Sequence, residues 1–204
     1  MRMLKWFTNF DKEERWLNQM AAQGYHFTHK DAFGLYVFAE GMPCEQNYRI
    51  DFRHFSNKKD YQDYINIFED SGWRFVYGKR SEGIQYFVPK LGMEADDIFS
   101  DALSKAGRYN RLAQQYMTLS IPFISLSIVL YTTGNFKYLG FEYYTPGLWE
   151  KTGLSFIWSF LFETPFVIMR GTLPFIPILL LAPFLLFAVK AKLKYKSALQ
   201  ESKL

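Results

Sequence analysis

The chain has 204 residues, of which 49% are hydrophobic and 20% aromatic, and it carries 24 Lys and Arg against 20 Asp and Glu. The formal net charge of +4 arises entirely after residue 115, because residues 1–115 hold 16 basic and 16 acidic side chains. A domain that binds nucleic acid would carry such an excess on its folded part, so the charge pattern argues against nucleic acid as a partner. The one cysteine, Cys44, excludes an internal disulfide, as expected in a reducing cytosol, and the neighbouring sequence offers no base to make it reactive.

The first residues predict no cleavable targeting signal. They begin with Arg2 and Lys5, but Asp11, Glu13 and Glu14 follow before any apolar run develops. We therefore expect the N-terminal half to stay in the cytoplasm, where it is made.

Residues 1–90 contain an internal repeat in which a helix, a glycine, a strand, a turn and a second strand follow one another twice. One copy aligns from Trp16 and the other from Tyr64, so that Gly24 matches Gly72. Glycine adopts the left-handed conformation that ends many helices, so both glycines predict helix stops. The two copies can bury their apolar faces against each other. The sequence therefore predicts one α+β domain, a tandem helix-strand-strand repeat with helices on one face of an antiparallel sheet.

Both predicted helices carry an apolar stripe. Asp11 and Glu14 have the spacing of a capping box, which predicts that the first helix starts at Asp11. The apolar positions then follow with helical spacing: Trp16, Leu17 and Met20 in the first helix, and Tyr61, Tyr64, Ile65 and Phe68 in the second. We expect both stripes to face the core.

Residues 48–53 predict an extra strand of the first half, because apolar and charged side chains alternate there. Arg49, Asp51 and Arg53 share the charged face and form the best polar constellation of the domain. One interpretation is a cross-strand charge network on the water side of the sheet. The functional alternative is a docking surface for a protein or an acidic ligand.

Several segments together resemble a known family. They are residues 10–25, the strand at 48–52, residues 68–73, and residues 98–101 followed by Ser104-Lys105 and Arg108-Tyr109. This combination resembles the domain of unknown function 2812 family over about the first half of the chain. The resemblance implies a bacterial, mainly Gram-positive, membrane protein that is often encoded beside a PadR-like transcriptional repressor. It implies no catalytic residues.

Residues 91–111 predict a helical connector that leads to a membrane. Its acidic residues lack the spacing of a calcium loop and read as a solvated face: Glu94, Asp96, Asp97 and Asp101. His26 and His29 would point to opposite faces of a strand, which argues against a metal site. No catalytic, metal-binding or cofactor-binding constellation is found in the sequence.

Two stretches without charged residues predict transmembrane helices at 112–133 and 172–189. The first follows a basic flank that includes Arg108 and Arg111, and the second precedes a basic tail at 190–204. Basic residues favour the cytoplasmic side of a membrane. We therefore predict a multi-pass protein of the bacterial cell membrane with both termini in the cytoplasm.

Residues 134–171 predict an aromatic extracytoplasmic loop. The apolar run at 154–162 is too short to cross a bilayer, and a third span would put the basic tail outside, so we interpret it as an interfacial or re-entrant segment. Glu163 and Arg170 have a spacing that places them on one helix face. They are candidates for a polar pair at membrane depth or for side chains that extend to the interface.

The favoured functional hypothesis is a membrane-tethered regulatory or sensing protein without catalysis. Its cytosolic domain would bind a partner protein, in an envelope-stress or repressor-linked response, and the bilayer is the other partner. The alternative is an accessory or assembly subunit of a membrane transporter complex. A third hypothesis is a membrane enzyme acting on a lipid or peptide through Glu163 and Arg170. No cofactor is expected in any of these readings.

Overall fold

The computed structural model describes residues 1–31, 33–93, 97–134 and 141–201, and it divides into two compact units. The first unit is Met1–Gln115 with Phe187–Leu204, and the second is Tyr116–Leu186. Two of the predicted acidic connector residues, Glu94 and Asp96, lie outside the described residues.

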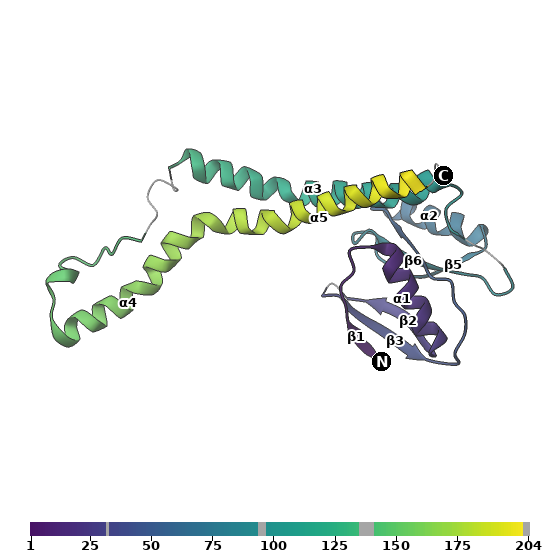
Figure 1. Ribbon diagram of the computed structural model, residues 1–204, viewed down its shortest axis with the longest axis horizontal. Helices are drawn as coiled ribbons and strands as arrows, with labels where there is room; N and C mark the ends of the chain where they lie inside the picture. Colours follow the sequence, from purple (N-terminus) through teal and green to yellow (C-terminus); the bar gives the residue numbers. More distant parts are fainter. Residues whose placement is uncertain (32, 94–96, 135–140, 202–204) are drawn as a thin grey trace. The chain divides into compact units, whose positions relative to one another are not determined.

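The first unit contains two successive β-α-β-β modules (Figure 1). The first comprises β1 (Arg2–Leu4), α1 (Phe10–Ala22), β2 (Tyr25–Lys30) and β3 (Leu35–Glu40), and the second comprises β4 (Arg49–Phe52), α2 (Lys58–Asp70), β5 (Trp73–Gly78) and β6 (Ile84–Pro89). Each module forms a three-stranded antiparallel sheet with its last strand in the centre, in the orders β1-β3-β2 and β4-β6-β5. The internal repeat therefore extends to the strand order.

Two predictions about the sheet are wrong. The strand at residues 48–53, predicted as an extra strand of the first half, opens the second module, and β1 is its unpredicted counterpart. The single predicted sheet is two sheets. Their neighbouring strands β2 and β5 both have a register shift, after Phe27 and after Phe75, and such bulges interrupt strand pairing. The Tyr77 hydroxyl bridges the two strands by donating to the Lys30 carbonyl at 2.7 Å.

The predicted helix stops are confirmed. Gly24 and Gly72 directly follow the C-terminal caps of α1 and α2, with φ of 85° and 90°. At Gly24 a Cβ atom would also lie 2.6 Å from the Gly41 carbonyl oxygen, so both conformation and space require glycine there.

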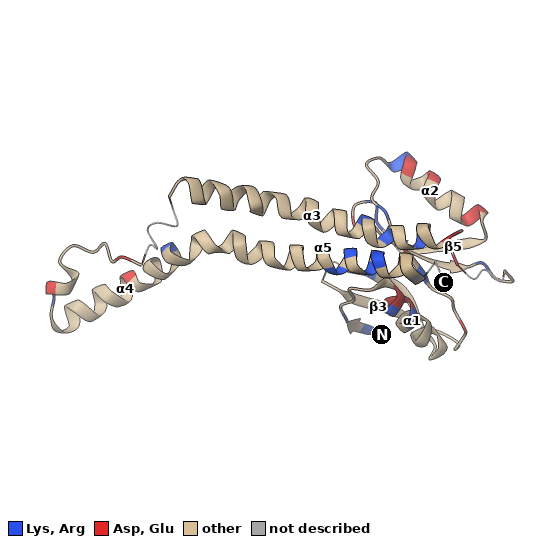
Figure 2. Ribbon diagram, turned by 45° about the horizontal axis from the view of Figure 1, so that its top comes forward, with Lys and Arg blue, Asp and Glu red and all other residues tan. Residues whose placement is uncertain are grey.

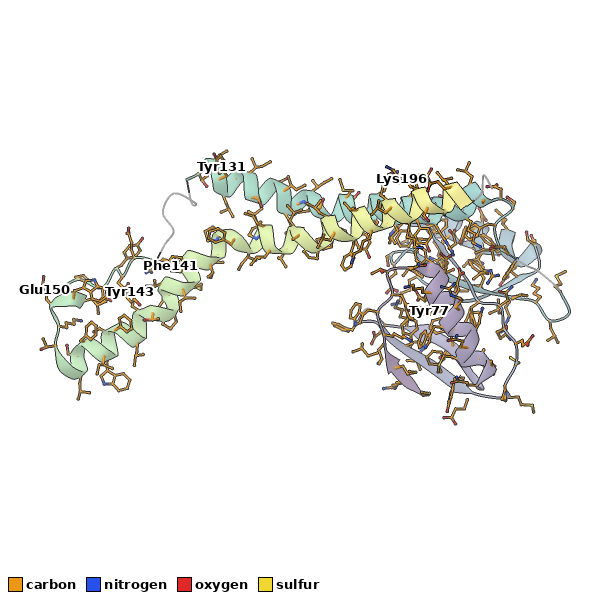
Figure 3. All side chains as sticks on the ribbon, in the orientation of Figure 1. Tyr77, Tyr131, Phe141, Tyr143, Glu150 and Lys196 are labelled. Carbon is orange, nitrogen blue, oxygen red and sulfur yellow. The ribbon has the colours of Figure 1, made fainter. Side chains whose placement is uncertain are left out.

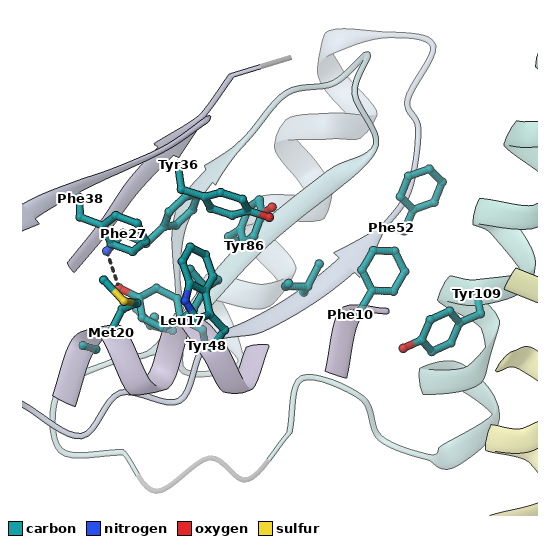
Figure 4. Packing of buried hydrophobic residues seen from close by; sticks show 14 residues of the cluster. Phe10, Leu17, Met20, Phe27, Tyr36, Phe38, Tyr48, Phe52, Tyr86 and Tyr109 are labelled. Atoms are coloured by element: carbon teal, nitrogen blue, oxygen red, sulfur yellow. Dashed lines mark hydrogen bonds between the residues drawn. The ribbon is translucent and has the colours of Figure 1, made fainter. Parts of the chain in front are cut away.

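The predicted helical stripes face two aromatic cores. Trp16, Leu17 and Met20 are buried against the first sheet, and Figure 4 shows Leu17 and Met20 beside Phe38 and Tyr36. The Trp16 ring meets that of Tyr36 edge-on, with centroids 4.8 Å apart. The same cluster includes side chains from one face of the second sheet: Tyr48, Ile50, Phe52, Tyr86 and Val88. On α2, Tyr64 and Ile65 are buried, and Tyr61 and Phe68 pack against them at the edge of a second cluster.

The prediction that both helices lie on one face of the sheet is wrong. Along β6, Tyr86 and Val88 join the cluster around α1, whereas Phe87 joins the cluster around α2. Since neighbouring residues of a strand point to opposite faces, α1 and α2 cover opposite faces of the second sheet. Both faces of this sheet are therefore buried.

The first unit also includes parts of two long helices, α3 (Ala102–Thr132) and α5 (Ile176–Glu201). From α3, Ala106, Tyr109 and Ala113 are buried, and the Tyr109 ring lies 5.1 Å from that of Phe10. From α5, Tyr195 packs against the same core cluster. The predicted connector and basic tail thus pack with the α+β modules.

The second unit contains the remainder of α3 and α5 together with η1 (Leu148–Glu150), α4 (Gly153–Thr172) and η2 (Leu173–Phe175). Two helical segments are long and apolar enough to cross a membrane, Ala102–Thr132 and Gly153–Gln200. The apolar run at 154–162, predicted as a short segment, is part of α4, which reaches Thr172 before the chain changes direction at η2 (Figure 1).

Candidate functional site

The first turn of α1 presents acidic side chains to α3. Asn9, not the predicted Asp11, caps the helix, because its side-chain oxygen accepts from the backbone N–H of Asp11 at 2.9 Å. This arrangement leaves the carboxylates of Asp11 and Glu14 available for partners outside α1. Figure 2 shows the charged residues on the ribbon.

Arg108 of α3 binds both carboxylates. Its Nη2 lies 2.5 Å from Asp11 Oδ1, and its Nη1 lies 2.5 Å from Glu14 Oε1 and 2.7 Å from the Ile50 carbonyl oxygen. The Arg108 side chain is completely buried. Its guanidinium carbon lies 5.3 Å from each of three ring centroids, those of Phe10, Phe99 and Tyr109. We call these groups the Arg108 cluster: Arg108, Asp11, Glu14, Tyr109 and Asn9.

The electrostatics of the Arg108 cluster follow from its burial. Burial raises the pKa of Glu14, and the Arg108 guanidinium opposes this shift. Burial alone would lower the pKa of Arg108, but Glu14, Tyr109 and Asp11 together outweigh the effect of burial, and the net shift of the pKa is upward. Arg108 therefore stays charged, and its charge is compensated inside the protein.

Tyr109 extends the Arg108 cluster to the helix cap. Its hydroxyl lies 2.9 Å from both Asn9 Oδ1 and Asp11 Oδ2, and burial raises its pKa. Two successive residues of α3 thus hold the start of α1 in place.

A second arginine of α3 binds β4. Arg111 Nη2 lies 2.5 Å from Asp51 Oδ1, and its Nε donates to the Phe52 carbonyl oxygen. Asp51 also accepts from the Tyr64 hydroxyl of α2 at 2.9 Å. Through Arg108 and Arg111, α3 is bonded to α1 and to the second module.

The third acidic residue of α1 lies in the core. Glu13 accepts from the hydroxyls of Tyr36 at 2.5 Å and Tyr86 at 2.6 Å, and Lys30 Nζ lies 3.4 Å away. Burial raises the pKa of both tyrosines, so they remain donors at neutral pH. Glu13 therefore joins α1 to both sheets.

The predicted constellation of Arg49, Asp51 and Arg53 does not form one water-facing patch. Asp51 is 3% exposed, because α2 and Arg111 cover this face of the strand. Arg49 is half-buried, with its Nε 3.6 Å from Asp97. Arg53 is exposed and lies 5.9 Å from the Tyr64 ring.

Glu163 and Arg170 lie together on α4 in the second unit, with Arg170 Nη2 3.4 Å from Glu163 Oε1. Glu163 accepts from the backbone N–H groups of Tyr144 and Thr145, the latter at 2.8 Å. The preceding Tyr143 also lies beside α4 (Figure 3), where its ring stacks on Phe160 at 5.1 Å. The pair thus fixes the chain before η1 to α4.

Among the described residues, no three His, Cys, Asp or Glu side chains lie so that they could hold a metal ion. The expectation that no base lies near Cys44 is wrong, because the Cys44 Sγ is 4.0 Å from His26 Nδ1. The prediction that His26 and His29 point to opposite faces of the strand is also wrong, because the β2 bulge lies between them.

Sequence reasoning missed the Arg108 cluster. It assigned Asp11 and Glu14 to a cap, and Arg108 and Arg111 to a basic flank of the membrane span. The available signal was a third acidic residue, Glu13, in the same turn, since a capping box uses only two side chains.

The fold and the Arg108 cluster define a class of protein: a tandem β-α-β-β domain bonded to the start of a long apolar helix. The chain belongs to the family described as "Protein of unknown function (DUF2812)", whose model matches residues 9–121. The matched region is more than half of the chain and includes both sides of the Arg108 cluster. No curated protein and no solved structure matches.

Proposed function

We propose that the protein is a membrane-tethered, non-catalytic regulatory or sensing protein whose cytosolic domain binds a partner protein. The observation that carries the proposal is that α3 provides two arginines to the domain and also contains an apolar segment long enough to cross a membrane.

The Arg108 cluster is suited to transmit a change from the apolar part of α3 to the domain. Separating a buried ion pair leaves uncompensated charge in a medium of low polarity, which costs several kcal/mol. A shift or rotation of α3 is therefore expected to move α1 and β4 with it rather than to break the contacts. This favours a protein in which the membrane segments set the state of the domain.

The use of the acidic residues supports a role without catalysis. Asp11, Glu13 and Glu14 are the acidic side chains of the first turns of α1, and each one bonds to a buried arginine or to buried tyrosines. Such carboxylates stabilise structure. We infer that the domain acts by presenting a surface.

The proposed location is the bacterial cell membrane, with both termini in the cytoplasm. The support is the basic flank before α3 becomes apolar and the lysines at 190, 192, 194 and 196 of α5. The implied link to a PadR-like repressor makes a repressor-linked or envelope-stress response the proposed context.

The alternative is an accessory or assembly subunit of a transporter complex. Its support is the large number of apolar side chains exposed on α4 and α5, such as Trp158, Phe162 and Leu179. Lipid would cover these side chains, but helices of a larger membrane protein would do so equally well.

Crosslinking in intact cells tests both proposals. The tagged full-length protein is treated with an amine-reactive crosslinker, purified in mild detergent and analysed by mass spectrometry. We expect the exposed lysines of the domain, such as Lys58, Lys59 and Lys79, to crosslink to one soluble protein. A stoichiometric multi-span partner linked to residues 116–186 would favour the alternative, and no recurrent partner would contradict both.

A matched variant tests the coupling itself. Arg108→Met removes the cation that compensates the carboxylates of Asp11 and Glu14, and it keeps an apolar side chain of similar length. We expect this variant to remain in the membrane fraction and to lose the crosslinks to the soluble partner. Unchanged crosslinks would show that binding of the partner does not depend on the Arg108 cluster.

A further inference from the structure

Two cavities of the first unit share three of their lining residues, Asn9, Lys12 and Lys194. One has a volume of about 540 Å³ and continues towards Arg15 and Lys105. The other, of about 580 Å³, is also lined by Trp6, Phe7, Lys190 and Leu193. We call the two together the basic crevice, which α1, α3, α5 and the segment before α1 surround.

The lining of the basic crevice is rich in cations: Lys12, Arg15, Arg49, Lys105, Lys190 and Lys194. The acidic side chains in the lining are Asp11 and Glu14, and both are bonded to Arg108. Among the described residues, Lys12, Arg15 and Lys194 have no carboxylate within 4 Å, whereas Lys105 is paired with Asp97 at 2.6 Å. The crevice therefore has positive charge that its own carboxylates do not compensate, and this charge favours an anionic ligand.

The place of the lining lysines in the sequence indicates which molecule carries the anionic group. Lys190 is the first charged residue after the apolar stretch that begins beyond Arg170. Lys190, Leu193 and Lys194 therefore line the crevice where α5 leaves its apolar part. At this level a membrane-spanning helix meets the phosphates of the lipid headgroups.

An exposed tryptophan in the lining fits the same environment. Trp6 is 72% exposed, although tryptophan side chains are highly buried on average. Trp6 lines the crevice together with Lys12 and Lys190. A tryptophan beside lysines is typical of the membrane interface, where its ring lies among the lipids and its N–H remains hydrated.

We propose that the basic crevice binds the phosphate of an anionic phospholipid headgroup. Lys12 of α1 and Lys194 of α5 contact the phosphate, and Trp6 lies against the glycerol and upper acyl region. The proposal rests on the membrane tethering proposed above and adds a ligand to it. A lipid bound there would contact α1, which is also the helix that the Arg108 cluster joins to α3.

Native mass spectrometry of the full-length protein in detergent tests this site with two lipid probes, phosphatidylglycerol and phosphatidylcholine. The test variant is Lys12→Gln with Lys194→Gln. The matched control is Lys58→Gln with Lys59→Gln, which removes the same charge from exposed positions on α2. A melting measurement on each variant verifies that the domain is folded.

We expect the wild-type protein to retain phosphatidylglycerol and not phosphatidylcholine. A basic residue near an anionic lipid surface contributes about fivefold in affinity, so the test variant should bind phosphatidylglycerol about 25-fold more weakly. The control should bind as the wild type does. This combination supports the proposal.

Three results would overturn it: equal affinity for both lipids, equal losses in the test and control variants, or complete displacement of the lipid by millimolar inorganic phosphate. The last would assign the crevice to a free anion. Failure of the tethering is distinguished separately, because the protein would then leave the membrane fraction on alkaline extraction. A protein that stays in that fraction but fails the lipid test contradicts only the headgroup site.

Discussion

The two units each contain an arginine paired with a glutamate, and the pairs differ in almost every physical respect. Arg108 and Glu14 are 2.5 Å apart, with 0% and 6% of their side chains exposed. Arg170 and Glu163 are 3.4 Å apart, with 31% and 8% exposed. Arg108 joins elements 94 residues apart, whereas Arg170 and Glu163 belong to one helix.

The difference shows that spacing in sequence is a poor guide to the strength of a pair. Glu163 and Arg170 are recognisable because they are isolated charges in an apolar region, yet the main partners of Glu163 are backbone N–H groups. Arg108 and Glu14 are hidden among other charges, yet their burial makes them costly to separate. We therefore expect the pair of Arg108 and Glu14 to determine the stability of the first unit, and the pair of Arg170 and Glu163 to have a local effect.

The largest effect is expected at Arg108. Arg108→Ala leaves Glu14 buried without its partner, which should destabilise the first unit by roughly 3–5 kcal/mol. Chemical unfolding of the full-length protein in detergent, followed by tryptophan fluorescence, measures this loss. Arg108→Lys should recover only part of it, because an ammonium group cannot match the fork of contacts to Asp11, Glu14 and Ile50. A loss below about 1 kcal/mol would mean that the cluster is not a structural junction.

Tryptophans in the two units should differ in a comparable way. Trp16 and Trp73 are buried in the cores of the first unit, so their replacement by Ala should cost roughly 3–5 kcal/mol. Trp158 of α4 is 71% exposed, and Trp158→Ala should leave the same unfolding transition within about 0.5 kcal/mol. Equal losses at Trp16 and Trp158 would contradict this assignment of core and surface.

Arg111 should have an intermediate effect. Arg111 is partly exposed, but its partner Asp51 is buried and, among the residues that the structure describes, would keep only the Tyr64 hydroxyl as a partner. Arg111→Ala should therefore cost roughly 1.5–3 kcal/mol. The exposed Arg53, which directly follows the same strand, is the matched control, and Arg53→Ala should cost less than about 0.5 kcal/mol. If Arg53 proved the more costly of the two, Asp51 would not depend on α3.

Among the three arginines that pair with a carboxylate, Arg108, Arg111 and Arg170, the smallest effect is expected at Arg170. Its pairing with Glu163 is long and partly exposed, so Arg170→Ala should cost less than about 1 kcal/mol. Glu163→Ala should cost more, because two backbone N–H groups lose their acceptor. The unfolding transition of the second unit, measured in the same detergent, ranks the two variants. The reverse ranking would indicate that the ion pair, and not the backbone contacts, holds residues 144 and 145.

The features predicted correctly from the sequence are those with a short-range periodic signal. The stripe of Trp16, Leu17 and Met20, the stops at Gly24 and Gly72, and the two long apolar segments each depend on residues within a few turns of one another. The similarity of the two halves was also visible, because their aromatic and glycine positions align.

The features that were missed depend on contacts between distant residues. Alternation in residues 48–53 indicates that the two faces of the strand differ, but it does not indicate that the charged face meets water. Asp51 is buried because α2 and Arg111 cover it, and Arg111 lies 60 residues further along the chain. The three residues of β1 are too few to show a period at all. The Arg108 cluster joins residues 97 and 94 apart, so no local pattern predicts it.

The proposed topology places the α+β domain in the cytoplasm and residues 141–150 on the opposite side of the membrane. In a variant without the natural cysteine, single cysteines at two exposed positions, Glu150→Cys and Lys59→Cys, can be labelled in intact cells with a maleimide that does not cross membranes. We expect the cysteine at 150 to be labelled and the cysteine at 59 to be labelled only after the cells are opened. Labelling of position 59 in intact cells, with position 150 protected, would contradict the cytosolic domain and the topology proposed with it.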